Sequence, residues 1–424
     1  MRDTGEKWVR ELERWSAPYL DAFQHKVRQR WAPMYLRGLL LPGERKSIEP
    51  LVDRVAPGER QQIHHFVAAS SWETAPIEVV HMDRCNELLG DPRAHLIVDD
   101  TALPKKGKHS VGVAHQYCGA LGKNANCQCL VSLTLARDEI PVPIALRLYL
   151  PEAWASDPKR RTAARVPPDV SFRPKWRIAL DEIDRLLEHK VQFGDVLADA
   201  GYGSCGEFRA ELSARNILWT VGVLSTQKVY PTSVRITEVK RKGARGPRPA
   251  HKAPSVPSQS VEQVIAQLGP NAIRTITWRR GTKGPLSGRF ALTRVRSADG
   301  PTMPTTKLHL PGDEVWLIAE FRTDETKYYF SSLAGSTPKK QVVSAVKARW
   351  SCEQMHQQMK EELGLDHFEG RSWYGLHHHA LLSMIAYAFL QHIRIREKKC
   401  LILEVVVPEV FSGTWKPEKN SRHG

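Results

Sequence analysis

Three acidic residues stand where one catalytic site can be built from them. Asp100 ends an apolar run that begins at His95, Asp199 ends the apolar run VQFGDVLAD, and Glu353 lies among strong helix formers. Apolar runs of this length predict buried strands, which can bring acids to one edge of a sheet. Carboxylates that meet repel one another unless a cation neutralises them. The metal ions predicted to bind are Mg²⁺ or Mn²⁺, and two such ions about 4 Å apart support in-line phosphoryl transfer.

The segment around Glu353 reads RWSCEQMHQQMK and is expected to be helical. No Gly or Pro interrupts residues 339–363, and Lys, Gln, Ala, Met and Glu are frequent. At about 100° per residue, Arg349, Glu353, His356 and Lys360 lie within about 60° of one another on one face. An i,i+4 ion pair between Arg349 and Glu353 on a solvated face is the alternative interpretation. For His356 we expect a structural role beside Glu353 rather than direct chemistry.

The charge balance predicts a polyanionic partner. The 424 residues include 62 basic and 46 acidic ones, for a formal net charge of +16. An excess of this size favours nucleic acid as the partner and disfavours an enzyme of small acidic substrates. The basic run KRKGARGPRPAHK at 240–252 is expected to be a solvated loop that can also bind DNA backbone.

Cysteine usage and hydropathy indicate a cytoplasmic, soluble protein. The seven cysteines are odd in number and scattered, which is typical of reduced thiols. The N-terminus is charged throughout, so no signal peptide is expected. The longest apolar run, residues 380–390, is too short to span a bilayer.

The order of elements predicts an α/β fold with a mixed sheet. Residues 1–90 are expected to form a helical domain that contacts DNA, and residues 91–224 the first part of a catalytic core. Residues 225–337 are expected to form a β-rich insertion. Residues 338–398 would return to the core as two helices, and residues 399–424 would be a loose tail.

Several of these segments resemble the DDE transposases of bacterial insertion sequences, whose catalytic domain has the ribonuclease-H-like fold. The resemblance runs from IVDDTALPKKGKHSVGVAHQYCGALGK through LADAGYG to the last helices. Some of these transposases carry a Tyr-Arg-Glu-Lys signature around the third acid. Arg349, Glu353 and Lys360 match its spacing, whereas Val346 occupies the tyrosine position. A long β insertion before the catalytic helix is also found in related transposases.

The resemblance implies that Asp100, Asp199 and Glu353 bind two divalent ions, Mg²⁺ or Mn²⁺. Asp99 and Asp100 must point to opposite faces of their strand, so only one of them can face the site. Asp100 is favoured because the resemblance aligns the first acid of the family with the residue that precedes Thr101. For the second acid, Asp195 is the alternative to Asp199, which lies nearer the end of its strand.

Basic and aromatic residues near these acids are candidate DNA contacts. Arg349 and Lys360 are expected to hold phosphates near the metals. Lys105 and Lys106 follow the first acid. They either contact a DNA phosphate or are ordinary surface residues.

Related enzymes stack a flipped base on an aromatic side chain, which makes Trp278, with Arg279 and Arg280, a candidate for this role. The favoured interpretation is that Trp278 is a strand residue whose ring covers the sheet. Trp316 is expected in the core. The run His377–His379 is expected at the surface or facing DNA, because consecutive helical residues do not chelate one ion together.

The predicted function is that of a transposase that cuts and joins DNA at the ends of an insertion sequence, by cut-and-paste chemistry that can pass through a hairpin. Double-stranded DNA is the expected partner, and a homodimer is expected because two ends must be joined. One alternative is a transposase-derived DNA-binding protein that no longer cleaves. Another is a different two-metal nuclease of the ribonuclease-H-like fold.

Overall fold

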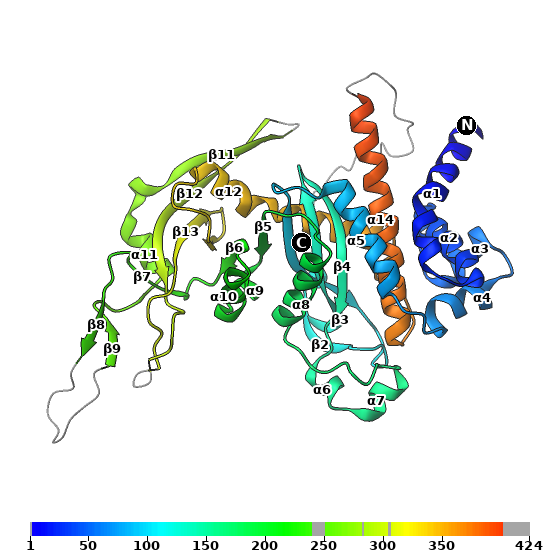
Figure 1. Ribbon diagram of the computed structural model, residues 1–424, viewed down its shortest axis with the longest axis horizontal. Coiled ribbons are helices and arrows are strands. Elements are labelled where there is room, and N and C mark those ends of the chain that lie inside the picture. Colours follow the sequence, from blue (N-terminus) through cyan, green and yellow to red (C-terminus); the bar gives the residue numbers. More distant parts are fainter. Residues whose placement is uncertain (1, 240–250, 282–283, 304–306, 402–424) are drawn as a thin grey trace, which may run out of the picture.

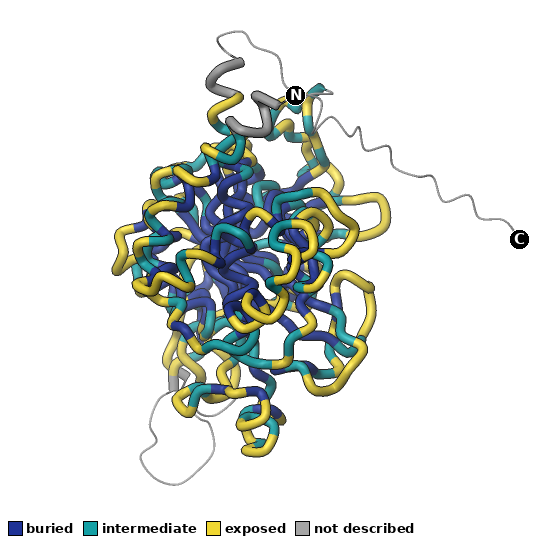
Figure 2. Tube along the Cα trace, turned by 90° about the vertical axis from the view of Figure 1, so that its right-hand side faces the viewer, coloured by how far each residue is buried: buried dark blue, intermediate teal, exposed yellow. Residues whose placement is uncertain are grey.

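The computed structural model describes residues 2–239, 251–281, 284–303 and 307–401. Most of the basic loop 240–252 and most of the predicted tail 399–424 therefore lie outside the described residues. The molecule is elongated, with a β-rich end, a central mixed sheet and a helical end that holds the N-terminus (Figure 1). A buried core runs through its middle (Figure 2).

The first 90 residues are helical, as predicted. They form α1 (Arg2–Ala22), α2 (Lys26–Leu40), α3 (Ile48–Val55), α4 (Arg60–His64), the π-helical turn η1 (His65–Ala69) and α5 (Ala75–Leu89). Their buried side chains, among them Tyr19, Leu36 and Trp72, belong to the same hydrophobic cluster as Ile97 of the central sheet and Phe389 of the last helix. These helices consequently share the core of the catalytic region instead of forming a separate one.

Five strands of the central sheet follow the ribonuclease-H-like order. The chain contributes β1 (His95–Pro104), β2 (Ala114–Cys118), β3 (Lys123–Arg137), β4 (Ile140–Leu148), β5 (Asp195–Ala198) and β6 (Leu218–Val223). The order is β4-β3-β1-β5-β6, with β1, β5 and β6 parallel and β3 antiparallel to both of its neighbours. The predicted fold class is therefore confirmed.

Helices connect and cover these strands. The parallel connections contain α8 (Lys175–Glu188) and α10 (Gly206–Ala214), because parallel neighbours need a crossover. The same part of the chain also contains four short helical segments: η2 (Gly119–Leu121), α6 (Glu152–Ala155), α7 (Pro158–Ala163) and α9 (Ala200–Gly203). The last helix, α14 (Trp373–Leu401), runs beside β4 and the N-terminal helices (Figure 1).

The predicted insertion is rich in strands and continues the central sheet. It contains β7 (Lys228–Tyr230), β8 (Ile236–Val239), β9 (His251–Pro254), β10 (Gln259–Ser260), α11 (Val261–Leu268), η3 (Pro270–Ala272), β11 (Arg274–Gly281), β12 (Gly284–Ser297), β13 (Glu314–Phe321) and β14 (Thr326–Ser331). Strand β14 pairs with β6, so the insertion and the core form one 12-stranded sheet. Only β8 and β9 pair separately among the described strands.

The helix expected across residues 339–363 is two helices. They are α12 (Lys339–Ala348) and α13 (Trp350–Glu361), which meet at Arg349. The backbone amide of Cys352 donates to the carbonyl of Arg349 at 3.1 Å, which is the tighter contact of a turn. Helix propensity alone does not show this break, because no Gly or Pro lies there.

The three consecutive histidines of α14 lie inside the protein, contrary to the surface position predicted for them. His378 bridges the carbonyls of Val67 and Trp72, each at 2.9 Å, and stacks on the Trp72 ring. His379 hydrogen-bonds the Tyr35 hydroxyl at 2.9 Å. Burial lowers the pKa of His377, His378 and His379 to about 4, so all three are neutral at pH 7. His378 and His379 join α14 to the N-terminal helices, whereas His377 contacts the Trp373 carbonyl of its own helix.

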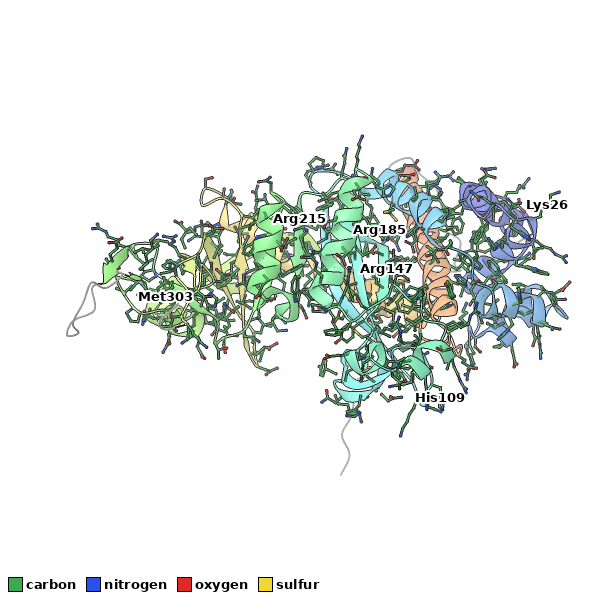
Figure 3. All side chains as sticks on the ribbon, turned by 60° about the horizontal axis from the view of Figure 1, so that its bottom comes forward. Lys26, His109, Arg147, Arg185, Arg215 and Met303 are labelled. Atoms are coloured by element: carbon green, nitrogen blue, oxygen red, sulfur yellow. The ribbon has the colours of Figure 1, made fainter. Side chains whose placement is uncertain are left out.

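A buried network of four charges fastens α5 to the sheet. Arg147 of β4 binds Glu78 of α5 and Glu182 of α8, and Arg185 of α8 binds both glutamates as well. The two arginines are labelled in Figure 3. Burial would raise the pKa of Glu78, and the two guanidinium groups outweigh that effect and hold the pKa well below its usual range. Each carboxylate is paired, as burial of charge requires.

We predict that Glu78→Gln lowers the free energy of unfolding by about 3 kcal/mol at pH 7, because it leaves buried guanidinium groups short of a counter-charge. Since the pKa of Glu78 is depressed by folding, its contribution is present above about pH 4.5 and is lost as the pH falls below that value. Urea unfolding measures both effects. Glu87→Gln, at an exposed carboxylate paired with Arg84, is the control and should change little. Equal losses in the two variants would contradict the prediction.

Candidate active site

The structure turns Asp99, and not Asp100, toward the Glu353 helix. In the β1–β3 pairing Asp99 lies opposite Ser132, on the face that α13 covers. Oδ2 of Asp99 accepts from Nη1 of Arg349 at 2.7 Å. The prediction that Asp100 faces this site is therefore corrected. Alternation along the strand required that only one of the two acids face it, and the packing of α13 decides which.

Asp100 belongs to a second polar cluster on the opposite face of β1. Its carboxylate is 2.5 Å from Nζ of Lys175, and it accepts a hydrogen bond from the Tyr202 hydroxyl at 2.6 Å. Burial would lower the pKa of Lys175, and the charge of Asp100 more than offsets this, so that the Lys175 ammonium is held in its charged form. Asp100 is thus already neutralised by a side chain of the protein.

Asp199 lies where the sequence places it, directly after β5. Oδ1 accepts from the backbone amides of Gly201 and Tyr202 at 2.9 and 3.2 Å and so caps α9. A Cβ atom at Gly222 of β6 would come within 2.8 Å of the amide of Ala200, so only glycine allows this close turn. The alternative, Asp195, lies at the other end of β5 and pairs with His95.

Arg349 connects the first and third acids. One guanidinium nitrogen contacts Asp99, and the other contacts Oε1 of Glu353, in the first turn of α13. The i,i+4 pair considered from the sequence is therefore present, but the same arginine also reaches a buried carboxylate of the sheet. The Glu353 side chain is 51% exposed, which leaves one side of the cluster open to solvent.

The electrostatics of this cluster suit a cation. Burial raises the pKa of Asp99 to about 7, Arg349 opposes that shift, and the neighbouring charge of Asp199 adds to it. The same Asp199 stabilises the charged form of Arg349. Three carboxylates consequently share the field of one guanidinium. Hard oxygen donors in mutual repulsion are the set that divalent cations neutralise, so the donor chemistry of these residues suits such ions, although their carboxylate oxygens do not all lie within 4.8 Å of one another.

The lysines predicted to contact DNA differ in their surroundings. Nζ of Lys105 donates to the backbone carbonyls of Asp366 and Phe368, at 3.3 and 2.7 Å, whereas Lys106 is exposed. Lys360 is half-buried, burial lowers its pKa, and no hydrogen bond of its ammonium occurs among the described residues. Lys106 and Lys360 therefore keep free donors, and Lys105 fastens the loop that follows α13.

Trp278 lies on β11 of the insertion and packs beside α12. Its ring meets Phe290 edge to face at a centroid distance of 6.1 Å and lies 5.1 Å from Nζ of Lys347 on α12. This is the position of a tryptophan that covers the sheet, the favoured reading of the sequence. Arg279 forms an ion pair with Glu139, and Arg280 is exposed. Trp316 is buried, as predicted.

Sequence reasoning missed Trp350, Cys352 and Ser132 at the site. Trp350, next to Arg349, is 50% exposed although it is large and apolar. Cys352 and His356 are buried under Asp99, where Nε2 of His356 is 2.8 Å from the Ser132 hydroxyl and burial lowers the pKa of His356 to about 3. Helical spacing indicated that His356 shares the face of Glu353. Nothing in the sequence indicated Ser132, because it is far away in the chain.

The six cysteine side chains among the described residues form no disulfide. None of the helices described has the length and apolarity needed to cross a membrane.

Comparison with known proteins identifies the family of this chain. The family model of DDE superfamily endonucleases matches residues 18–285, which is more than half of the chain. The chain therefore belongs to the DDE superfamily endonucleases, a family that generally uses divalent metal ions. The matched region contains Asp99 and Asp199 and ends before the helix of Glu353.

A probable transposase for insertion sequence element IS701 from Microchaete diplosiphon is 28% identical to this chain over 225 residues. The match covers 53% of this chain and 55% of that protein, so the chain spans about half the length of this relative.

We predict that Arg349→Gln destabilises the protein by about 1–3 kcal/mol at neutral pH without Mg²⁺, because Asp99 and Glu353 lose their shared cation. Added Mg²⁺ should then raise the melting temperature of the variant more than that of the unchanged protein, as measured by differential scanning calorimetry. Arg322→Gln removes an arginine from the buried Glu320 elsewhere and should leave the Mg²⁺ response unchanged. Identical Mg²⁺ responses in all three proteins would contradict this account.

Proposed function

We propose that this protein is a transposase that cuts and joins DNA at the ends of an insertion sequence, with Asp99, Asp199 and Glu353 as its catalytic carboxylates. The observation that carries the proposal is the bridge that Arg349 makes between Asp99 and Glu353, with the charge of Asp199 beside it. It gathers acids from β1, from the end of β5 and from α13 into one electrostatic unit. The match to a probable insertion-sequence transposase supports the substrate.

Two divalent ions, Mg²⁺ or Mn²⁺, would supply activation of the attacking oxygen and stabilisation of the leaving oxygen when bound. The protein's own part is positioning. Asp99 is fixed on a central strand and Asp199 by two backbone amides, whereas Glu353 stands at the open side. With the acids neutralised by metal, Arg349 would be released to hold a phosphate, and Lys360 would hold another. Trp350 offers an exposed face for a base.

Cut-and-paste transposition requires that one strand be cut at each end and that the freed 3′-hydroxyl attack a second phosphodiester. In the proposed reaction this attack forms a hairpin on the opposite strand before the target is joined. A homodimer on double-stranded DNA would bring the two ends together, and we place this activity in the cytoplasm. The exposed Lys26 of the N-terminal helices (Figure 3) and Lys106 beside the sheet would add contacts to DNA backbone.

We predict that Asp99→Asn, Asp199→Asn and Glu353→Gln each reduce strand cleavage by at least about 10²-fold, because each removes a charge that the metals require. The assay is denaturing electrophoresis of DNA that carries the two ends flanking the gene, incubated with Mg²⁺ and the purified protein. Hairpin products on the same gels test the proposed pathway.

Asp100→Asn is the matched control for Asp99→Asn. It alters the neighbouring residue but faces Lys175, so it should keep cleavage within about tenfold of the unchanged protein. If Asp100→Asn abolished cleavage while Asp99→Asn retained it, the assignment of the first acid would be reversed. Absence of any cleavage by the unchanged protein, with DNA binding intact, would favour a transposase-derived DNA-binding protein.

We also predict a steep salt dependence of DNA binding. With a net charge of +16, affinity for a 30-base-pair duplex should fall by about 10³-fold between about 50 and 200 mM salt. Fluorescence anisotropy gives the slope of log K against log salt. Lys106→Gln should reduce that slope by about 1. Lys105→Gln should leave it unchanged, since that ammonium serves backbone carbonyls. A flat salt dependence would refute electrostatic binding.

A further inference from the structure

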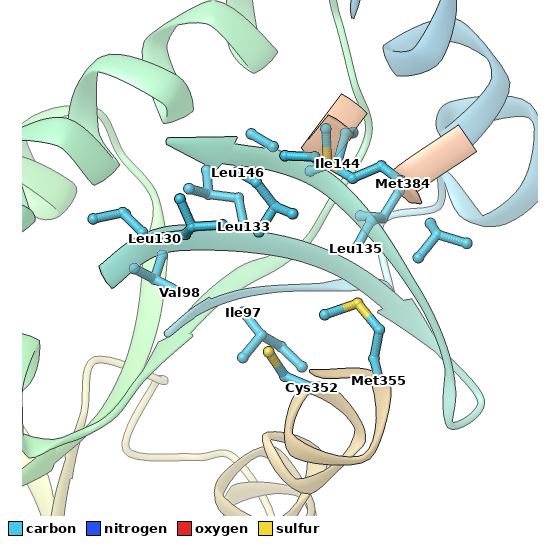
Figure 4. Close-up of a cluster of buried hydrophobic side chains, with 14 of the residues drawn as sticks. Ile97, Val98, Leu130, Leu133, Leu135, Ile144, Leu146, Cys352, Met355 and Met384 are labelled. Atoms are coloured by element: carbon cyan, nitrogen blue, oxygen red, sulfur yellow. The ribbon is translucent and has the colours of Figure 1, made fainter. Parts of the chain in front are cut away.

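A sulfur and nitrogen donor pair lies directly behind the first acid. The donor atoms of Asp99, Cys352 and His356 all lie within 4.8 Å of one another, and the three residues are buried. They come from β1 and from successive turns of α13. Cys352 points from α13 toward the underside of the sheet, next to Ile97 (Figure 4). No other trio of such donors occurs among the described residues.

We propose that Asp99, Cys352 and His356 bind a thiophilic divalent cation of the Zn²⁺ class, at a site behind the Mg²⁺-binding carboxylates that shares only Asp99 with them. Zinc accepts thiolate, imidazole and carboxylate ligands together, whereas Mg²⁺ prefers oxygen alone. Three protein ligands leave the fourth position of a tetrahedral ion open.

The distances fit such an ion. Typical bonds of about 2.3 Å to sulfur and about 2.0 Å to nitrogen place these two ligand atoms at most about 4.3 Å apart. Sγ of Cys352 is 3.9 Å from Nδ1 and 3.7 Å from Nε2 of His356, so both ring nitrogens lie within this range. The Ser132 hydroxyl contacts Nε2 at 2.8 Å, which leaves Nδ1 for the ion, and it can fix the imidazole, as residues behind a metal ligand commonly do.

The charges also balance. On binding, the Cys352 thiol gives its proton to solvent and the sulfur becomes a thiolate. A dication with one thiolate and one carboxylate is then neutral, which satisfies a buried site. Asp99 would leave Arg349 to join the ion, and Arg349 would keep Glu353 as its partner.

The chain contains a natural comparison. His81 and Cys85 form another i,i+4 pair, with Sγ of Cys85 3.5 Å from Nε2 of His81. Their neighbours are the Tyr19 hydroxyl and the Pro143 carbonyl, and no carboxylate of the part of the chain that the structure describes completes the set. If burial of a cysteine beside a histidine were enough, both pairs would bind metal.

A consequence for cleavage rests on the proposed function, because the zinc site and the Mg²⁺ site would both use Asp99. An ion held by Cys352 and His356 withdraws this carboxylate from the open cluster, so Zn²⁺ would inhibit Mg²⁺-dependent cleavage. A cell could in this way lower transposition when free zinc rises.

Cobalt titration of the full, metal-free protein tests the site independently of cleavage. Co²⁺ stands in for Zn²⁺ and gives a thiolate-to-cobalt charge-transfer absorption when sulfur is a ligand. We expect this absorption to saturate at one Co²⁺ per chain and to disappear on addition of Zn²⁺. Cys352→Ser and His356→Gln should abolish it, Asp99→Asn should weaken cobalt binding at least tenfold, and Cys85→Ser should leave it intact.

The outcomes separate the two proposals. An absorption that survives in Cys352→Ser, or its absence in the unchanged protein, overturns the site whatever the cleavage assay shows. Cobalt binding with the expected variant pattern in a protein that does not cleave DNA upholds the site and overturns the proposed function. Circular dichroism of each variant confirms folding, and Cys352→Ala is the second variant should Cys352→Ser fail to fold.

Discussion

One guanidinium group determines the geometry of the candidate site. Arg349 stands where α12 ends and α13 begins, and its two nitrogens contact a buried acid of the sheet and a half-exposed acid of the helix. Without this cation, carboxylates from three distant segments would repel one another. The break between the two helices, the orientation of α13 and the choice between the neighbouring acids of β1 are all consistent with this contact.

The order of strands and helices along the chain and the approximate location of the site could be predicted from the sequence. Apolar runs ending in acids predicted β1 and β5, and helix-forming residues around Glu353 predicted α13. Periodicity established that Asp99 and Asp100 face opposite sides, but it carries no information on which side the distant helix covers. That choice depends on packing across more than two hundred residues of chain, as in the contact between His356 and Ser132.

Burial was the other property that local patterns did not show. Three adjacent histidines have the appearance of a polar surface, yet two of them, His378 and His379, satisfy backbone carbonyls and a tyrosine hydroxyl at the junction of α14 with the N-terminal helices. The charge network of Glu78 and Arg147 fastens another N-terminal helix, α5, to the sheet. The N-terminal helices, which the sequence predicts to be a separate DNA-binding domain, thus share the hydrophobic core of the central sheet.

The pairing of β14 with β6 gives the insertion a direct mechanical connection to the chemistry. Strand β6 also pairs with β5, which ends at Asp199. A load placed on the outer hairpin of β11 and β12, for example by a bent duplex, would travel through consecutive hydrogen-bonded ladders toward that aspartate. A single continuous sheet therefore joins the far end of the molecule to the strand that precedes the second acid.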